Sequence, residues 1–203
     1  MKLTTLEKLL EDQLKDLYSA EAQILKALPK MAKTASSDAL REAFEHHLEE
    51  TRGQVERLER IRDLMGIKIS GKKCKGLEGL IEEGKEVLEA DGDEAIVDAA
   101  LIAAAQKVEH YEIGAYGTAR TLAQQLGQDE VAELLQETLD EESAADEKLT
   151  AIAESEIYPQ VQEEASEEDE EAEEEDEEME SEEEEDMEAP TGKGRRRQPA
   201  GRR

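Results

Sequence analysis

The chain has few of the residues that disulfides and aromatic cores require, and no apolar run long enough for a membrane helix. Its 203 residues include one cysteine, Cys74, no tryptophan, four tyrosines and one phenylalanine. A single cysteine cannot form an intramolecular disulfide, which suits a reducing cytosol. No stretch approaches the roughly 20 apolar residues of a membrane helix, and the N-terminus lacks the apolar segment of a signal peptide. We therefore expect a soluble cytoplasmic protein without membrane contacts.

Positive charge is also scarce, and it is unevenly distributed. The formal net charge is -30, with 20 acidic side chains in residues 163–188 and six Lys or Arg in residues 193–203. The remaining residues carry 35 acidic and 19 basic groups, a net charge of -16. A body this acidic is unsuited to lying along nucleic acid or anionic lipid.

The composition changes abruptly near Pro159. Residues 161–203 have almost nothing to bury, so we predict that they form a disordered tail, acidic and then basic, behind a single folded domain of residues 1–160. The basic end, "GKGRRRQPAGRR", could contact nucleic acid weakly, in competition with the adjacent acidic run, and would lose binding as salt rises. The alternative is a tail that only keeps the protein soluble.

What the chain does have is helical periodicity in four long segments. The segments run from Thr4 until Pro29 disturbs the pattern, from Asp38 to Gly66, from Asp93 to Gly127, and from about Asp129 to Ser155. Short loops join the first two and the last two segments, so each pair should be antiparallel. The pairs are joined by about 27 residues that include a shorter helix in "GLEGLIEEGKEVLEA". With no strand pattern present, the sequence predicts an all-α four-helix bundle with one long crossover.

Acidic residues interrupt the apolar stripe near the midpoint of each long segment. They are Glu21, Glu50, Glu109 with Glu112, and Glu142. Helix midpoints lie at one level of an antiparallel bundle, so these acids should converge. Burying several ionised carboxylates together is costly unless a cation compensates them. The pattern therefore predicts a dinuclear metal site of the kind found in carboxylate bundles, although any one of these acids could simply be solvated.

Histidines and tyrosines near these acids leave alternatives open. His47 is either a ligand or a core histidine, whereas His46 and His110 are expected at the surface or behind the ligands. Four of the five aromatic residues lie within about two helical turns of a proposed ligand; they are Tyr18, Phe44, Tyr111 and Tyr116. Tyrosine hydroxyls could donate to the ligating carboxylates, or the rings could fill the core.

Several strings resemble, in order and spacing, the bacterial YciE/YciF family of ferritin-like stress proteins. They are "LYSAEAQ", "HLEETRGQVERL", "CKGLEGLIEEG", "AALIAAAQKVEHYEIGAYGTARTLA" and "LLQETLDEESAADEKL", and the resemblance covers residues 3–155. It implies a ferritin-like bundle related to rubrerythrin and manganese catalase, commonly dimeric and associated with stress responses. The biochemical activity of the family is poorly defined.

This chain matches only part of the metal-ligand pattern of rubrerythrin-like proteins. The resemblance implies Glu21, Glu109 with Glu112, and Glu142 as ligands, but the histidines expected three residues after Glu50 and Glu142 are replaced by Gly53 and Ala145. Asp146 and Gln54, one residue further along, could supply oxygen ligands, and an oxygen-rich site favours manganese more than a histidine-rich one. The predicted metal ligands are Glu21, His47, Glu50, Glu109, Glu112, Glu142 and Asp146, holding two divalent ions, Fe or Mn.

Two functions of different classes follow. One is a di-metal oxidoreductase of the peroxidase, catalase or oxidase kind, acting on peroxide or dioxygen during stress. The other is a non-catalytic protective or interaction protein with a degenerate site. A homodimer is expected from the resemblance, and storage in a ferritin-type cage is a weaker third option.

Overall fold

A computed structural model describes residues 4–163 and residue 166. This part of the chain holds five α-helices and a π-helical turn, and no strand. The elements are α1 (Leu6–Thr34), α2 (Asp38–Met65), α3 (Lys75–Leu88), α4 (Glu94–Gln125), α5 (Asp129–Ile152) and the π turn η1 (Ala153–Ile157). The all-α prediction is confirmed.

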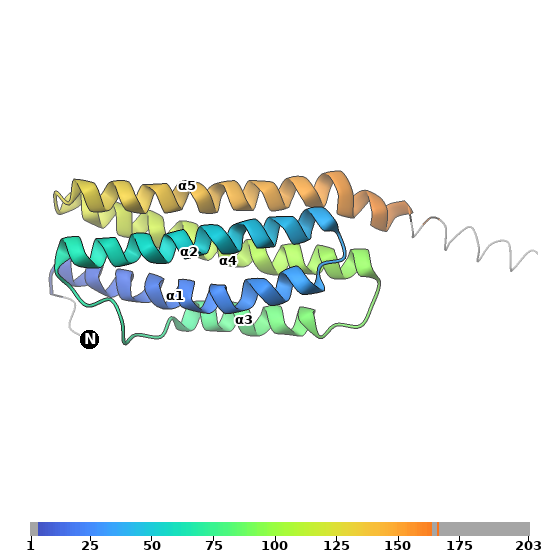
Figure 1. The fold of residues 1–203 in the computed structure, drawn as a ribbon, viewed down its shortest axis with the longest axis horizontal. Helices are drawn as coiled ribbons and strands as arrows, with labels where there is room; N and C mark the ends of the chain where they lie inside the picture. The colour runs from blue at the N-terminus through green and yellow to red at the C-terminus, as the bar shows by residue number, and fades with distance from the viewer. Residues whose placement is uncertain (1–3, 164–165, 167–203) are drawn as a thin grey trace, which may run out of the picture. The chain divides into compact units, whose positions relative to one another are not determined.

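The four long helices form two antiparallel hairpins, α1–α2 and α4–α5 (Figure 1). The hairpins pack so that α1 lies along α4 and α2 lies along α5. The crossover after α2 returns along the bundle and places α3 against α1 and α4 (Figure 1). The predicted bundle with one long crossover and a short helix is therefore confirmed.

Local chemistry sets most helix ends where the sequence predicts them. The Ser37 hydroxyl accepts from the backbone N–H of Leu40 at 3.2 Å, and Asp93 Oδ1 accepts from the N–H groups of Ala95 and Ile96 at 2.9 and 3.1 Å. Such caps satisfy amides that have no partner inside the helix. Gly66 follows α2 with φ 63°, a left-handed conformation that glycine adopts without strain.

Two helix ends differ from the prediction. Pro29 does not end α1, which continues to Thr34. The proline lies on the exposed side, while Leu28 and Ala32 remain buried, so packing offsets the lost helical hydrogen bond. The last helix also continues beyond Ser155, through η1 and residues 158–163, and buries Ile157 completely. Apart from residues 161–163 and 166, the predicted tail lies outside the described residues.

A buried carboxylate ties the two hairpins together at one end. Asp98 of α4 is 1% exposed, and its two oxygens accept from the backbone N–H groups of Ser36 and Ser37, at 3.0 and 2.7 Å. These amides belong to the loop between α1 and α2. Asp98 therefore supplies, from the second hairpin, the hydrogen bonds that this loop cannot make internally.

Contacts around Cys74 fix the crossover to the bundle. The backbone N–H of Cys74 donates to Ser19 Oγ at 2.9 Å, and Gln23 donates to its carbonyl at 3.1 Å. Its thiol lies 2.9 Å from the hydroxyl of Tyr111, whose ring comes within 3.0 Å of the place where a Cβ on Gly76 would be. Glycine at this position lets α3 begin close to α4 without displacing the Tyr111 ring.

The buried interior has two apolar parts with a polar layer between them. The α3-side core contains Ala20, Ile24, Leu28, Phe44, Leu77, Leu101, Ala105 and Leu149, among others. The opposite core contains Leu10, Leu14, Leu17, Leu58, Tyr116, Ala119, Val131 and Leu135, among others. Between them lie Glu21, His47, Glu109, Glu112 and Glu142, which we call the carboxylate layer.

No helix in the described part of the chain is long and apolar enough to cross a membrane.

Candidate metal centre

Each long helix buries one side chain every three or four residues, and the carboxylate layer occupies positions within these stripes. In α2, for example, the buried stripe runs through Phe44, His47, Thr51, Gln54 and Leu58. The same spacing places Glu21 after Leu17 in α1, and Glu142 after Thr138 in α5. The ionisable groups are therefore held by the same packing that holds the apolar core.

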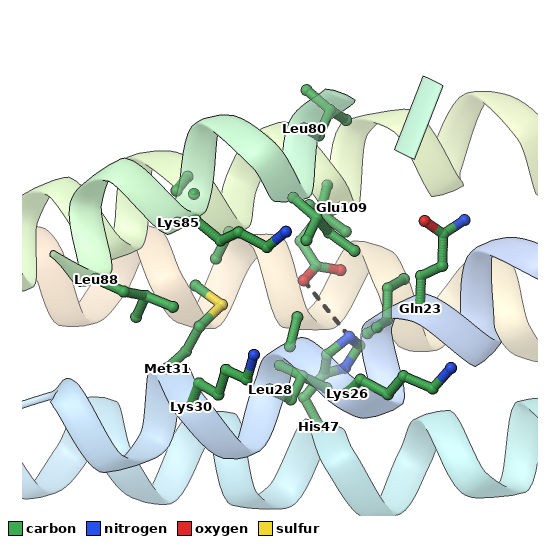
Figure 2. A pocket seen from close by; sticks show the side chains of 17 residues that line it. Gln23, Lys26, Leu28, Lys30, Met31, His47, Leu80, Lys85, Leu88 and Glu109 are labelled. Carbon is green, nitrogen blue, oxygen red and sulfur yellow. Dashed lines mark ion pairs between the residues drawn. The ribbon is translucent and has the colours of Figure 1, made fainter. Parts of the chain in front are cut away.

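Four side chains converge closely enough to share a metal ion. His47, Glu109, Glu112 and Glu142 each offer one ligand atom, and these atoms all lie within 4.8 Å of one another. The imidazole Nε2 of His47 lies 3.5 Å from Glu109 Oε1, as the dashed line in Figure 2 marks, and 3.7 Å from Glu142 Oε2. All four residues are buried, with at most 5% of their surface exposed.

Glu21 reaches the same layer from α1. It is fully buried, its charge acts on Glu112, and its Oε1 accepts a short hydrogen bond from the hydroxyl of Tyr116. One tyrosine thus donates to a proposed ligand, as the sequence suggested. Tyr18 and Tyr111 do not, because their hydroxyls donate to Glu59 and Asp16, at 3.1 and 2.6 Å.

Burial and mutual repulsion shift the pKa values of these groups. Burial, with the charge of Glu142 added, raises the pKa of Glu21 to about 8, and burial raises the pKa of Glu109 to about 7. Burial likewise raises the pKa values of Glu112 and Glu142 well above their ordinary value. Without a cation, the layer must therefore hold protons near neutral pH.

The pKa of His47 is also raised. Burial lowers it, but the interaction with Glu50 and the charge of Glu142 outweigh burial. Glu50 Oε2 lies 3.4 Å from His47 Nδ1, on the side of the ring away from the carboxylates of the layer. A carboxylate on one imidazole nitrogen orients the other for a metal.

The unsatisfied atoms of the layer suit a divalent cation. Within the described part of the chain, no amide, hydroxyl or cationic group forms a hydrogen bond to Glu21 Oε2, Glu109 Oε2, Glu142 Oε2 or either carboxylate oxygen of Glu112, and His47 Nε2 has no hydrogen-bond partner. Only protons shared within the pairs Glu21–Glu112 and Glu109–Glu142 can satisfy some of these oxygens. Each buried polar atom without a partner costs about 1–3 kcal/mol. Carboxylate oxygens with an imidazole nitrogen are ligands that Fe and Mn accept, so the residues present fit a metal site.

Two of the predicted ligands are not brought into this cluster. Glu50 is about one quarter exposed and lies between His46 and His47, and Asp146 accepts from Gln106 at 3.1 Å and faces His110. Glu50 lies one position off the buried stripe of α2, whereas Asp146 lies between Glu142 and Leu149 on the stripe of α5 but is only partly buried. Their role as ligands stays a prediction. His46 and His110 are exposed, as expected for surface groups.

Comparison with known proteins places the chain in a family. The family model described as a domain of unknown function, DUF892, matches residues 5–165. The chain belongs to the DUF892 family. It is 48% identical to the protein YciF of Escherichia coli K-12 over 166 residues, which span 81% of this chain and all of YciF.

Solved structures agree with this DUF892 assignment. The crystal structure of the E. coli stress protein YciF matches with a TM-score of 0.73 and 51% identity, covering 74% of this chain and 96% of that one. YcfI of Rhodopseudomonas palustris matches with a TM-score of 0.71 and 44% identity, over 73% and 95% of the two chains. A protein of Xanthomonas campestris, 23% identical with a TM-score of 0.63 over 79% and 99% of the two chains, shares the fold.

In this DUF892 protein, polar side chains around the carboxylate layer hold its glutamates by hydrogen bonds, and the sequence pattern identifies only some of these side chains. The side-chain amide of Gln54 donates to Glu142 Oε1 at 2.6 Å and to Glu141 Oε2 at 3.1 Å. Arg57 in turn donates to Glu141 and to Thr138, at distances of 2.6–3.0 Å. Gln54 could be found from its place on the buried stripe of α2. Nothing in the sequence pattern distinguishes Arg57 from the other arginines of that helix.

Proposed function

We propose that this protein is a ferritin-like stress protein of the cytoplasm whose carboxylate layer binds two divalent metal ions, Fe or Mn, and reacts with peroxide or dioxygen. The observation that carries the proposal is the set of buried, unpartnered carboxylate and imidazole atoms that converge between the two cores. Four buried glutamates carry four negative charges when ionised. Two divalent ions would balance them.

The residues that would hold the ions are His47, Glu109, Glu112 and Glu142, with Glu21 on the side of α1. Bound Fe or Mn would supply a change of oxidation state and Lewis acidity, which no side chain of the layer can supply. The chain itself orients the ligands. Glu50 fixes the ring of His47, and Gln54 and Tyr116 hold Glu142 and Glu21.

One observation favours the non-catalytic alternative. The positions expected to carry histidine, at Gly53 and Ala145, offer no ligand, and Asp146 lies outside the cluster. A layer with one histidine and four glutamates could hold metal for stability without redox turnover. The predicted homodimer is compatible with both the catalytic and the non-catalytic function.

The decisive experiment measures metal first and turnover second. Protein purified without chelator should contain close to two Fe or Mn ions per chain by elemental analysis, and Glu112→Gln should lose them. Glu147→Gln, on the exposed side of α5, is the matched control and should keep them. Consumption of peroxide and dioxygen by the loaded protein then separates the two functions. Absence of metal from the native protein, with no uptake of added Mn(II) or Fe(II), would overturn the proposal.

A further inference from the structure

A cavity of about 260 Å³ opens beside the carboxylate layer, between α1, α3 and α4. Aliphatic side chains line most of it, including Leu28 and Met31 from α1 and Leu80 and Leu88 from α3 (Figure 2). At its inner end are His47 and Glu109, two members of the candidate metal centre. The cavity therefore connects an apolar space to the proposed chemistry.

Three lysines surround this space, Lys26 and Lys30 from α1 and Lys85 from α3 (Figure 2). All three are exposed, and within the described residues none forms an ion pair. Lys72 and Lys107 differ, since their amines lie 2.8–2.9 Å from carboxylates. Unpaired lysines around an apolar cavity of a strongly acidic body attract an anion.

We propose that this cavity binds a medium-chain carboxylate, with its head group at the lysines and its alkyl chain inside. The aliphatic lining accommodates an apolar chain and disfavours a polar one. We place the head group at the lysines because they are the unpaired cations of the cavity lining, whereas the other lining residues between the lysines and His47 are mostly aliphatic. The volume lies just below the roughly 300–1,000 Å³ of drug-sized sites, so we take octanoate as the probe of this class.

This inference rests on the proposed function in one respect. If the layer holds metal, the end of the alkyl chain would lie beside His47 and Glu109, which makes medium-chain carboxylates the candidate substrate class. Binding itself needs only the cavity and the lysines. Metal binding and carboxylate binding can therefore be tested separately in the same variants.

Titration calorimetry with octanoate tests the proposal on the full chain, both metal-free and loaded with Mn(II). Gly84→Leu fills the cavity from α3, where a Cβ meets only Ala104, at 3.9 Å. Gly79→Leu is the control, because it lies on the same helix, has open space around it and does not line the cavity. We expect octanoate affinity to fall at least tenfold in Gly84→Leu and to stay unchanged in Gly79→Leu.

A second pair of variants tests the head group without disturbing the core. Lys85→Gln should weaken octanoate several-fold, whereas Lys75→Gln, also exposed on α3, should not. Neutral octanamide should bind wild type more weakly than octanoate.

Three results would overturn the proposal. They are no saturable binding of octanoate to wild type, equal binding by the Gly84→Leu and Gly79→Leu variants, and a change of oligomeric state in Gly84→Leu with octanoate affinity retained. The last would make this face an interface between copies of the chain. Elemental analysis of wild type keeps the two proposals apart. A wild-type protein that holds metal but does not bind octanoate refutes only this proposal, and one that binds octanoate but takes up no metal refutes only the metal proposal.

Discussion

The two cores on either side of the carboxylate layer are built by the same four helices, yet they are packed differently. In the opposite core, leucines such as Leu10, Leu14 and Leu135 are completely buried. The α3-side core includes buried alanines such as Ala20 and Ala105, and a fifth helix, α3, packs against α1 and α4 on this side. The cavity is lined by residues of the α3-side core and by none of the opposite core. Small side chains that admit a docking helix also leave space beside the site.

The largest expected effect separates the two cores directly. Leu14→Ala should cost about 2–5 kcal/mol of unfolding free energy, because it opens a new cavity in the tightly packed opposite core. Leu28→Ala should fall at the low end of that range, since Leu28 already borders a cavity. Urea denaturation of both variants measures the difference. Equal losses would show that the two cores are packed alike.

The layer between the cores should make the metal-free protein less stable as pH rises. The pKa of Glu21 is about 8 when folded, against an ordinary value of 4.5, so the folded state binds the extra proton between these pH values. The contribution of this proton to the free energy of unfolding is then largest below about pH 4.5. It is lost as pH rises through about 8, and the total loss is on the order of a few kcal/mol. Thermal melting with EDTA from pH 5 to 9 should show this slope, and Glu21→Gln should flatten it. A wild-type slope unchanged by Glu21→Gln would contradict the assignment.

Removing one carboxylate of the layer should affect the loaded and metal-free proteins differently. Glu142→Ala should abolish the stabilisation by metal, which is about 2.7 kcal/mol for one site at a metal concentration of 100 times Kd. The metal-free variant should be as stable as wild type or more stable, because one of several repelling groups is gone. Gln54 keeps Glu141 as its acceptor, at 3.1 Å. A large loss of metal-free stability would instead assign Glu142 a structural hydrogen-bonding role.

The smallest expected effect concerns α3 alone. Gly79→Ala should stabilise the protein by about 0.5–1 kcal/mol, since the added methyl group meets nothing within 4 Å and alanine favours the helix. Gly76→Ala should gain less or lose stability, because its Cβ would come within 3.0 Å of the Tyr111 ring. Chemical denaturation of the two variants compares them. An equal gain would mean that Tyr111 can move away freely.

The sequence predicts the helices and the crossover well because their signals are local and strong. Ser37, Gly66 and Asp93 mark helix ends by backbone chemistry that needs no tertiary context. Pro29 misleads because its effect depends on which side of the helix it occupies. The buried stripe decides that side, and packing keeps α1 intact.

The candidate site is harder to predict because one helical position, about 100°, separates a buried carboxylate from a solvated one. Glu50 lies one position off the stripe of α2, whereas His47 lies on it. Asp146 is in phase with the stripe of α5 but is only partly buried, which the spacing alone does not reveal. Following the spacing through Phe44, His47, Thr51 and Gln54 would have found this arrangement. The cavity could not be predicted, since it depends on how closely α3 docks.

The bonds from Asp98 to the loop between α1 and α2 should couple the unfolding of the two hairpins. The first hairpin could separate from the second only by breaking both bonds, and a local shift of the loop that did not admit water would leave the buried carboxylate of Asp98 without partners. Partial opening at this end therefore costs more free energy than opening a loop whose hydrogen bonds are all made within its own hairpin. The amide protons of Ser36 and Ser37 should exchange with solvent only when the whole bundle unfolds, although they belong to a surface connection.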